Sequence, residues 1–328
     1  MRIENQQLAT RKASKKGMGA WGDIRIGISG WRYLGWRKKF YPEDLAQRRE
    51  LEYASRKFNS IELNGSFYSL QRPESFETWY QETPEDFVFS VKGSRFVTHM
   101  LKLLRVEVPL ANFFAQGVLR LREKLGPILW QFPAQFTCNP ERLESFFSLL
   151  PRTQKEAAKL ARRHDERLDN RSWFRVQQDR PLRHAIEIRH NSFVCEEFIA
   201  LLRRHDIGLV VADTVEWPLL MDVTAGFVYC RLHGSEQLYV SGYESDALEV
   251  WAHRVVRWSR GGEVTDAARA SATSAPPAAA RDVYVYFDND AKVRAPFDAM
   301  ALQKRVSELI KAPSPVSSPP ARRANMNP

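Results

Sequence analysis

Short apolar runs recur along the chain, and each of them ends in polar residues. Eight runs have the length and the content of β-branched and aromatic residues that are typical of strands, at residues 24–29, 60–64, 87–92, 127–132, 185–189, 208–213, 227–233 and 283–289. Most of them are separated by segments in which apolar residues recur at helical spacing, at residues 48–58, 113–125, 140–150, 196–205 and 246–258. This alternation predicts an α/β fold with a parallel sheet, and eight parallel strands can close into a (β/α)8 barrel.

The predicted barrel is TIM-barrel-like and occupies residues 21–311 as a single domain. One interval is too short for a full helix: residues 214–226, between the sixth and seventh strands, have room only for a turn or a short helix. An open doubly wound sheet is the alternative architecture. No glycine-rich phosphate-binding motif follows the first strand to support that alternative.

Four further segments lie outside the pattern of strands and helices. Residues 151–183 and 260–281 are insertions into the barrel, and the second is low in complexity, so we expect it to be a mobile loop. We expect residues 1–20 to be a disordered basic tail and residues 312–328 to be a disordered tail rich in proline and serine.

The net charge of +10 is concentrated in such segments. Residues 1–20, 151–183 and 311–328 hold five, ten and three basic residues against one, five and no acidic ones, so the remaining residues are slightly acidic in sum. Clustered Lys and Arg attract nucleic acid. A basic excess in tails and an insertion is, however, more typical of solvated segments than of one binding surface. Nucleic-acid binding therefore stays an alternative function.

The composition limits the class of protein further. The 328 residues are 44% hydrophobic, which is enough for a sizeable core. No apolar run approaches the roughly 18 residues that a membrane span needs, and the first twenty residues lack the apolar segment of a signal peptide. Cys138, Cys195 and Cys230 form neither a disulfide framework nor a zinc motif. We therefore expect a cytoplasmic protein without membrane contact, and the sequence identifies no cofactor and no obligate protein partner.

Polar side chains stand where the predicted strands end. In a parallel barrel these ends share one rim, where the active sites of such enzymes lie. Alternation of side chains places Glu187 with Arg189, and Arg231 with His233, on the same face of their strands. A buried carboxylate is costly unless it is paired, and convergence on one pocket would supply the partners of Glu187.

The candidate site follows from this convergence. The candidate catalytic residues are Glu62, Glu187 and Asp213 as general bases and His233 as an acid or a base. The candidate substrate-binding residues are Trp31, Asn64, Lys92, His99, Gln131, Arg189, His190, Arg231 and Asn289. Each has a structural alternative: the histidines and Asp213 could cap helices, Lys92 could reach solvent, and the charges could form a network that only closes the barrel mouth.

The charges also decide between a metal ion and an anion as the ligand. Glu62, Glu187, Asp213 and His233 are ligand types that could hold a divalent metal. Three cations at the same rim (Lys92, Arg189 and Arg231) would repel a metal ion and suit phosphate or carboxylate instead. We therefore favour an anion site without a metal. In a water-filled pocket of this kind, we expect Glu187→Gln to cost only about 1 kcal/mol of stability.

Eight motifs then identify a resemblance. "GISGW", "FNSIELNGSFY", "FSVKGSRFVTH", "ILWQFP", "AIEIRHNSF", "VVADT", "YCRLHG" and "VYVYFDND" occur in the order in which they are found in the DUF72 family, also called YecE-like. The resemblance runs from about Ile24 to Leu309 and implies a barrel related to the TIM barrel, with no established activity. It implies a shared polar set: Glu62, Asn64, Lys92, Thr98, His99, Gln131, Glu187, Arg189, His190, Asp213, Arg231, His233, Gly234 and Asn289. Two positions differ from the family pattern, because Asn191 stands where proline is common and Asp288 where asparagine is usual.

Three functions are compatible with these observations. The first is an enzyme, with hydrolysis as the favoured reaction, that binds an anionic, phosphate-bearing substrate at the C-terminal rim of the barrel. The second is a non-catalytic nucleic-acid or nucleotide-binding protein, whose partner is a nucleic-acid fragment and whose basic tails provide the attraction. The third is a divalent-metal-dependent hydrolase similar to phosphodiesterases, which rests on analogy between folds alone.

Overall fold

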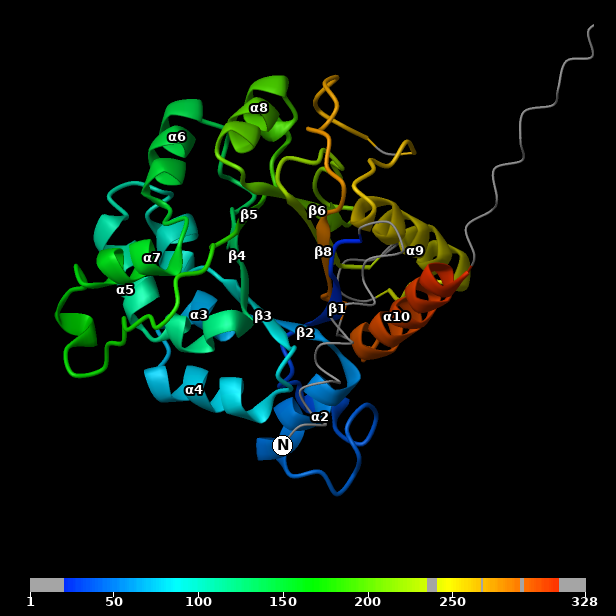
Figure 1. The fold of residues 1–328 in the computed structure, drawn as a ribbon, viewed down its shortest axis with the longest axis horizontal. Coiled ribbons are helices and arrows are strands. Elements are labelled where there is room, and N and C mark those ends of the chain that lie inside the picture. The colour runs from blue at the N-terminus through cyan, green and yellow to red at the C-terminus, as the bar shows by residue number, and fades with distance from the viewer. Residues whose placement is uncertain (1–20, 235–240, 267, 290–291, 313–328) are drawn as a thin grey trace, which may run out of the picture.

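The strands of the protein form a closed barrel in chain order (Figure 1). The computed structural model describes residues 21–234, 241–266, 268–289 and 292–312. The strands are β1 (Ile24–Ser29), β2 (Ser60–Leu63), β3 (Val88–Lys92), β4 (Leu125–Gln131), β5 (His184–Glu187), β6 (Gly208–Asp213), β7 (Phe227–Leu232) and β8 (Asp282–Phe287). All pairs are parallel, and β1 pairs with both β2 and β8. The predicted (β/α)8 barrel is confirmed, and each predicted strand is present with ends that differ by at most two residues.

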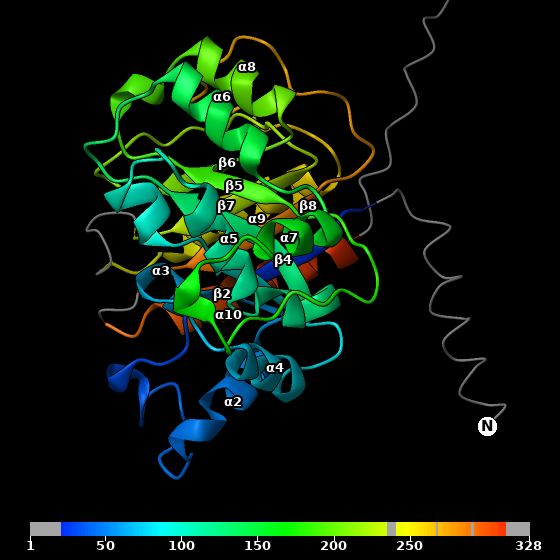
Figure 2. The same ribbon diagram turned by 90° about the vertical axis from the view of Figure 1, so that its left-hand side faces the viewer.

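Helices cover the outside of the barrel, as Figures 1 and 2 show from two directions. They are α2 (Glu50–Lys57), α3 (Gly65–Tyr68), α4 (Pro73–Glu82), α5 (Glu107–Ala115), α6 (Pro140–Leu149), α7 (Gln154–Ala161), α8 (Glu196–Arg204), α9 (Ser245–Ser259) and α10 (Ala295–Lys311). In α8, for example, Phe198, Leu201 and Leu202 recur at helical spacing and are buried. The covering helices thus follow from the apolar stripes in the sequence.

One predicted helix ends earlier than its apolar pattern indicates. A single helix over residues 113–125 is wrong, because α5 ends at Ala115 and a separate 3-10 turn covers Val118–Lys124. Gly117 lies between them with φ +111°, and a Cβ atom there would stand 2.5 Å from Cα of Pro73. Only glycine adopts this left-handed backbone readily, so the chain turns here instead of continuing the helix.

The two insertions differ in structure. Residues 151–183 include α7, which packs against α5. Residues 260–281 contain no helix or strand among those described, yet the segment is tied to the chain between β6 and β7. The carboxylate of Asp222 accepts hydrogen bonds from the backbone N–H groups of Ala270 (2.8 Å) and Ser271 (3.0 Å). The predicted mobility of this segment stays a prediction, and these bonds restrain its centre.

The chain between β6 and β7 has no helix, as the sequence predicts. Residues 214–226 run as irregular backbone, and Leu220, Met221 and Val223 within them are buried. The backbone N–H of Met221 donates to the carbonyl of Ala268 at 2.9 Å. The later insertion therefore packs against the chain between β6 and β7.

Alternate strand residues point into the barrel and fill it. Tyr229 and Tyr286 belong to a buried cluster formed by Leu129, Ala185, Val210, Ala212, Phe227, Tyr229, Tyr284 and Tyr286. Ser60 Oγ lies 2.7 Å from the hydroxyl of Tyr286, and Ser90 Oγ lies 2.7 Å from the hydroxyl of Tyr229. This packed layer closes the barrel below the C-terminal ends of the strands, so any binding site at that end has a solid floor.

The predicted tails, residues 1–20 and 313–328, lie outside the described residues. In the described part of the chain, no helix is long and apolar enough to cross a membrane.

Candidate functional site

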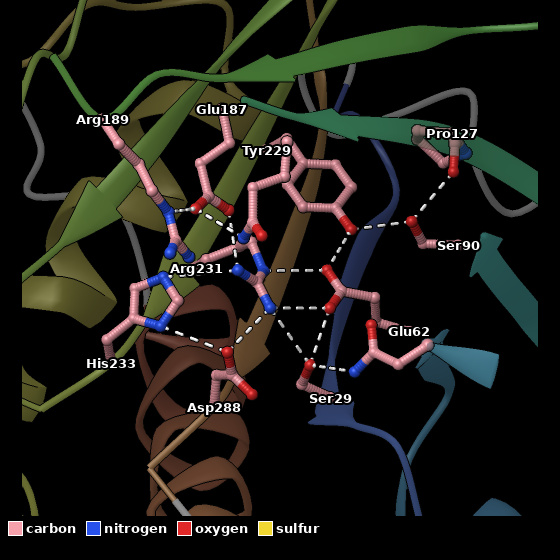
Figure 3. Close-up of polar contacts among 12 residues, drawn as sticks. Ser29, Glu62, Ser90, Pro127, Glu187, Arg189, Tyr229, Arg231, His233 and Asp288 are labelled. Atoms are coloured by element: carbon pink, nitrogen blue, oxygen red, sulfur yellow. Dashed lines mark hydrogen bonds and ion pairs between the residues drawn. The ribbon is translucent and has the colours of Figure 1, made fainter. Parts of the chain in front are cut away.

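Arg231 is the centre of a buried charge network at the C-terminal end of the barrel (Figure 3). Its guanidinium donates to Glu62 (Nε–Oε2 3.0 Å and Nη2–Oε1 2.9 Å), to Glu187 (Nη1–Oε2 2.7 Å) and to Asp288 (Nη2–Oδ2 2.8 Å). Arg231 is 1% exposed, and each of its three guanidinium nitrogens is engaged by a carboxylate. The charge of Arg231 is therefore already paired within the protein, which disfavours it as the group that neutralises a bound anion.

The two glutamates of the network are completely buried. Glu62 also accepts hydrogen bonds from Ser29 Oγ and from the hydroxyl of Tyr229, both at 2.6 Å. Glu187 also accepts from Gln131 Nε2 (2.8 Å) and Arg189 Nε (3.0 Å).

These partners keep Glu187 ionised. Burial alone would raise the pKa of Glu187, but Arg231 and Arg189 hold that pKa well below its usual range. The carboxylate of Glu187 is thus stabilised as a charged group and is a weak base.

Asp288 and His233 complete the network on the side of β8. Nδ1 of His233 lies 3.2 Å from Oδ2 of Asp288, and the ring of His233 meets the ring of Trp217 edge to face at 5.5 Å. Burial would raise the pKa of Asp288, whereas Arg231 and His233 hold that pKa below its usual range. Asp288 was not among the predicted site residues, although it directly follows a strand, and that position was the signal for it.

A cavity of about 1020 Å³ opens above this network. Its lining comes from the C-terminal ends of the strands and from the loops that follow them. Seven of the predicted substrate-binding residues line it: Trp31, Asn64, Lys92, His99, Gln131, Arg189 and Arg231. The lining also includes residues that the sequence did not single out: Arg32, Tyr33, Phe67, Tyr68, Arg95 and Met100. They lie in loops or short helices whose spatial position no strand pattern predicts.

Lys92 is the last residue of β3 and points into this cavity. It is 7% exposed, and its Nζ lies 4.3 Å above the centre of the Phe67 ring. Nζ makes no hydrogen bond or ion pair with any described residue. Burial, and then the positive charge of Arg231, lower the pKa of Lys92 to about 8, against the opposing effect of the nearby carboxylates.

His99 stands beside Lys92 on a π-helical turn, Phe96–Met100. Its Nδ1 is hydrogen-bonded to the hydroxyl of Thr98 at 2.9 Å, and its ring meets Phe67 edge to face at 5.1 Å. Burial lowers the pKa of His99 to about 4, and the charges of Lys92, Arg189 and Arg95 add to this effect. His99 is therefore neutral at neutral pH, and three cations surround it.

Three predicted site residues, Asp213, His190 and Asn289, belong neither to the cavity lining nor to the charge network around Arg231. The side chain of Asp213 accepts a hydrogen bond from Trp251 Nε1 of α9 at 3.1 Å, and burial raises its pKa. Val210 and Ala212 are the inward residues of β6, so Asp213 faces the helices outside the barrel.

His190 and Asn289 have structural contacts instead. The ring of His190 accepts from the backbone N–H of Ser192 at 3.1 Å and caps a short 3-10 turn. The amide of Asn289 donates to the carbonyl of Ser241 (3.0 Å) and to Oδ2 of Asp298 (2.8 Å), which fastens a loop to α10. These contacts leave both residues outside the proposed site.

The network does not fit a metal ion. Among the described residues, no group of three or more His, Cys, Asp or Glu side chains is placed so that it could hold one. Glu62, Glu187 and Asp288 all direct an oxygen at the same guanidinium. The cation at this position is thus supplied by the side chain of Arg231.

Comparisons with known proteins agree with this architecture. The UPF0759 protein YunF of Bacillus subtilis (strain 168) is 34% identical over 129 residues, which cover 37% of this chain and 43% of YunF. The UPF0759 protein YecE of Escherichia coli (strain K12) is 28% identical over 127 residues, which cover 39% of this chain and 43% of YecE. The matched region thus spans less than half of either curated relative.

Solved structures match over a larger part of the chain. A DUF72 family protein from Thermotoga maritima has a TM-score of 0.65 and 25% identity, with coverage of 87% of this chain and 99% of that one. One from Enterococcus faecalis V583, at 19% identity and a TM-score of 0.61, supports the fold alone, with coverage of 87% and 95%. The family model described as "Protein of unknown function DUF72" matches residues 25–323. The chain belongs to the DUF72 family.

Proposed function

We propose that the protein is an enzyme that binds a small anionic substrate in the cavity at the C-terminal ends of the barrel strands. The observation that carries this proposal is the ammonium group of Lys92, which points into the cavity from a buried position and has no hydrogen bond or ion pair with the described residues. A buried cation without a partner is costly for the folded protein, so a binding role offers a reason for its presence.

Two further cations support an anionic ligand. Arg95 is exposed at the same cavity and makes no hydrogen bond or ion pair with any described residue. Arg189 lies over the ring of Trp217 at 4.1 Å, with its Nε bound to Glu187. Lys92, Arg95 and Arg189 all line the cavity together with His99, and all three lower the pKa of His99. Arginine and lysine in this arrangement suit phosphate or carboxylate.

The other part of the lining suits a flat or apolar group. Its aromatic members are Trp31, Tyr33, Phe67, Tyr68 and Trp79. Aromatic walls with a few polar groups are typical of small-molecule sites. The proposed substrate therefore combines an anionic group with an aromatic or other apolar part, as an aromatic phosphate or carboxylate does.

Hydrolysis is the reaction type that the sequence favours. In the structure, Glu62 and Glu187 are committed to Arg231, so Lys92 and His99 are the groups of the lining that can exchange a proton with a substrate. A metal-dependent version lacks a suitable ligand set among the described residues. Nucleic-acid binding through the tails rests on residues 1–20 and 313–328, outside the described part of the chain. The predicted cytoplasmic location stays a prediction.

Calorimetric titration with phenyl phosphate and inorganic phosphate tests the binding. We expect phenyl phosphate to bind more tightly, and Lys92→Met to weaken its binding by about tenfold or more, because a charge-assisted hydrogen bond contributes about 1.5–3 kcal/mol. Lys304→Met, which removes an exposed lysine of α10 outside the cavity, is the matched control. Release of nitrophenolate from p-nitrophenyl phosphate would support hydrolysis.

Two outcomes would contradict the proposal. Equal affinity of the wild type and Lys92→Met for phenyl phosphate would remove Lys92 from the site. Loss of phosphate binding on deletion of residues 1–20 and 313–328, with no effect of Lys92→Met, would favour the tails and the nucleic-acid alternative.

A further inference from the structure

The protein offers its own comparison for Lys92, because two lysines are buried among the described residues. Lys124 is 4% exposed, and its Nζ donates to the carbonyls of Tyr80 (2.6 Å) and Thr83 (2.9 Å) and to Thr83 Oγ1 (3.2 Å). All three donors of that ammonium group thus have acceptors. Lys92 is buried to a similar degree but has no acceptor among the described residues. The two buried lysines therefore differ in whether the described part of the fold supplies hydrogen-bond acceptors for the ammonium group.

The position of Lys92 makes its nitrogen reachable from the cavity. Ser90 and Lys92 share the inward face of β3, and Ser90 belongs to the hydroxyl layer below the cavity. The side chain of Lys92 rises from this layer along Phe67, and Nζ ends at the cavity lining. Arg95 lies at the more exposed edge of the same cavity. A ligand whose anion meets Arg95 would therefore place its other end close to Lys92.

We propose that Lys92 is a nucleophile that forms an imine with the carbonyl group of an anionic aldehyde or ketone. This inference rests on the proposed function, because the same cavity holds the anionic group. An amine that is desolvated and free of acceptors is the form of lysine that attacks carbonyl carbon. An ion-paired or hydrogen-bonded lysine such as Lys124 would first have to leave its partners.

The reaction is balanced without an oxidant or a reductant. The lone pair of Nζ forms the new C–N bond while the π electrons of the carbonyl move to its oxygen. That oxygen then leaves as water with the two protons of the amine, and a C=N double bond remains. Protonation of the imine creates a positive charge, which the carboxylates of Glu62, Glu187 and Asp288 can stabilise from the floor of the site.

An imine would also change the expected reaction class. A protonated imine withdraws electrons from the adjacent carbon, which favours proton removal or carbon–carbon cleavage there. The enzyme would then be a lyase or an isomerase of a carbonyl compound, whereas hydrolysis of an ester needs no such adduct. The anion-binding part of the proposed function is the same in both cases.

The pH dependence follows from the groups that face Lys92. These are Arg231 of β7, Glu187 of β5, Glu62 of β2, Asp288 after β8, and His99 of the π-helical turn. Together with burial they give Lys92 a pKa of about 8, so about a tenth of its amine is neutral at pH 7. An ordinary lysine, with a pKa of about 10.4, has less than about a thousandth in that form. Labelling of Lys92 should therefore rise through pH 8.

Reductive trapping tests the inference on the full-length protein. The protein is incubated with 4-formylbenzoate, an aromatic aldehyde with a carboxylate, and treated with sodium borohydride, which converts an imine to a stable secondary amine. Peptide mass spectrometry then locates the adduct. We expect modification of Lys92 to exceed that of the exposed Lys304 by about tenfold or more at pH 7.5, because the neutral amine is the reactive form.

Two controls separate the chemistry from the binding. Lys92→Arg keeps the charge but cannot form an imine, so we expect it to lose the adduct and to retain binding of terephthalate, which has no aldehyde. Benzaldehyde lacks the anion and should label Lys92 less than 4-formylbenzoate does. Circular dichroism and a thermal melt confirm that the variant is folded.

Each outcome bears on one of the two proposals. Terephthalate binding that depends on Lys92, with no trapped adduct at Lys92, would overturn the imine and leave the anion site standing. An adduct at Lys92 that forms equally well with benzaldehyde, without terephthalate binding, would support the nucleophile and overturn the anion site. Uniform labelling of exposed lysines, with Lys92 unmodified, would also overturn the imine.

Discussion

Glu187→Gln tests whether the charges around Glu187 form a network that stabilises the fold or line a water-filled pocket that tolerates the loss of a charge. The change preserves the shape of the side chain but removes its charge. It also replaces one carboxylate oxygen by an NH2 group, which would face the donors that now bind Glu187: Gln131 Nε2, Arg189 Nε and Arg231 Nη1. The variant therefore loses an ion pair and gains a contact between donors.

The structure gives a larger effect than the sequence indicates. From the sequence we expect a loss of about 1 kcal/mol, with solvent, Glu62 and Asp213 taking up the charge. Glu187 is, however, fully buried, and Asp213 faces away from the barrel interior. Loss of one partner of a buried pair costs about 3–5 kcal/mol. Glu62 and Asp288 still bind Arg231, so the lower end of that range, about 3 kcal/mol, is the expected loss.

Urea unfolding followed by tryptophan fluorescence measures this loss. With an m-value of about 3 kcal/mol/M, the midpoint should fall by about 1 M. Glu144→Gln is the control, because Glu144 binds Arg204 and His205 at the exposed surface, where ion pairs contribute little. A midpoint within about 0.3 M of the wild type, at an unchanged m-value, would show that water or rearrangement replaces the lost charge. The buried network would then not be a source of stability.

Four shorter predictions use the same assays. The pKa of Asp288 is depressed in the folded protein, so the ionised carboxylate stabilises the fold at neutral pH and this contribution is lost as the pH falls below about 4. The free energy of unfolding of Asp288→Asn should therefore depend less on pH than that of the wild type between pH 4 and 2. Arg231→Met leaves three carboxylates without their cation and should cost about 5 kcal/mol or prevent folding; a stable variant would refute the central role of Arg231. Lys92→Met should not lower the free energy of unfolding by more than about 1 kcal/mol, because Nζ has no acceptor among the described residues to lose, and a larger loss would indicate a structural role. Asp222→Ala should speed tryptic cleavage within residues 260–281, whereas an unchanged rate would mean that the segment is already mobile.

The strands could be predicted from the sequence because each is a short β-rich run between polar residues. The early end of α5 could not, because apolar residues continue past Gly117 at helical spacing while its backbone turns left-handed. Alternation correctly brought Glu62, Glu187 and Arg231 together, since polar residues on these strands mark the inward face. It failed for Asp213, because β6 is apolar on both faces and its pattern does not reveal which face is inward.

Whether each cation is paired with a carboxylate could not be predicted from the sequence, for a different reason. Arg231 reaches Glu62 across 169 positions of the chain and Glu187 across 44. Whether a cation is paired or open depends on such distances, which strand order alone does not supply. The sequence therefore indicated three cations at one rim, and the structure shows Arg231 and Arg189 paired with carboxylates and Lys92 without an ion pair to any described residue.

The missing helix after β6 has a consequence for how the chain folds. In most units of such a barrel, the helix that follows a strand covers it, and the contact can form as soon as that unit is complete. Here the backbone of Ala270 and Ser271 binds Asp222 from 48 and 49 positions later in the chain. Contacts of such sequence separation are slow to form, because a long loop must close first. During synthesis, Asp222 and the chain between β6 and β7 would thus lack these partners until the segment after α9 emerges, which leaves this part of an incomplete barrel open to aggregation.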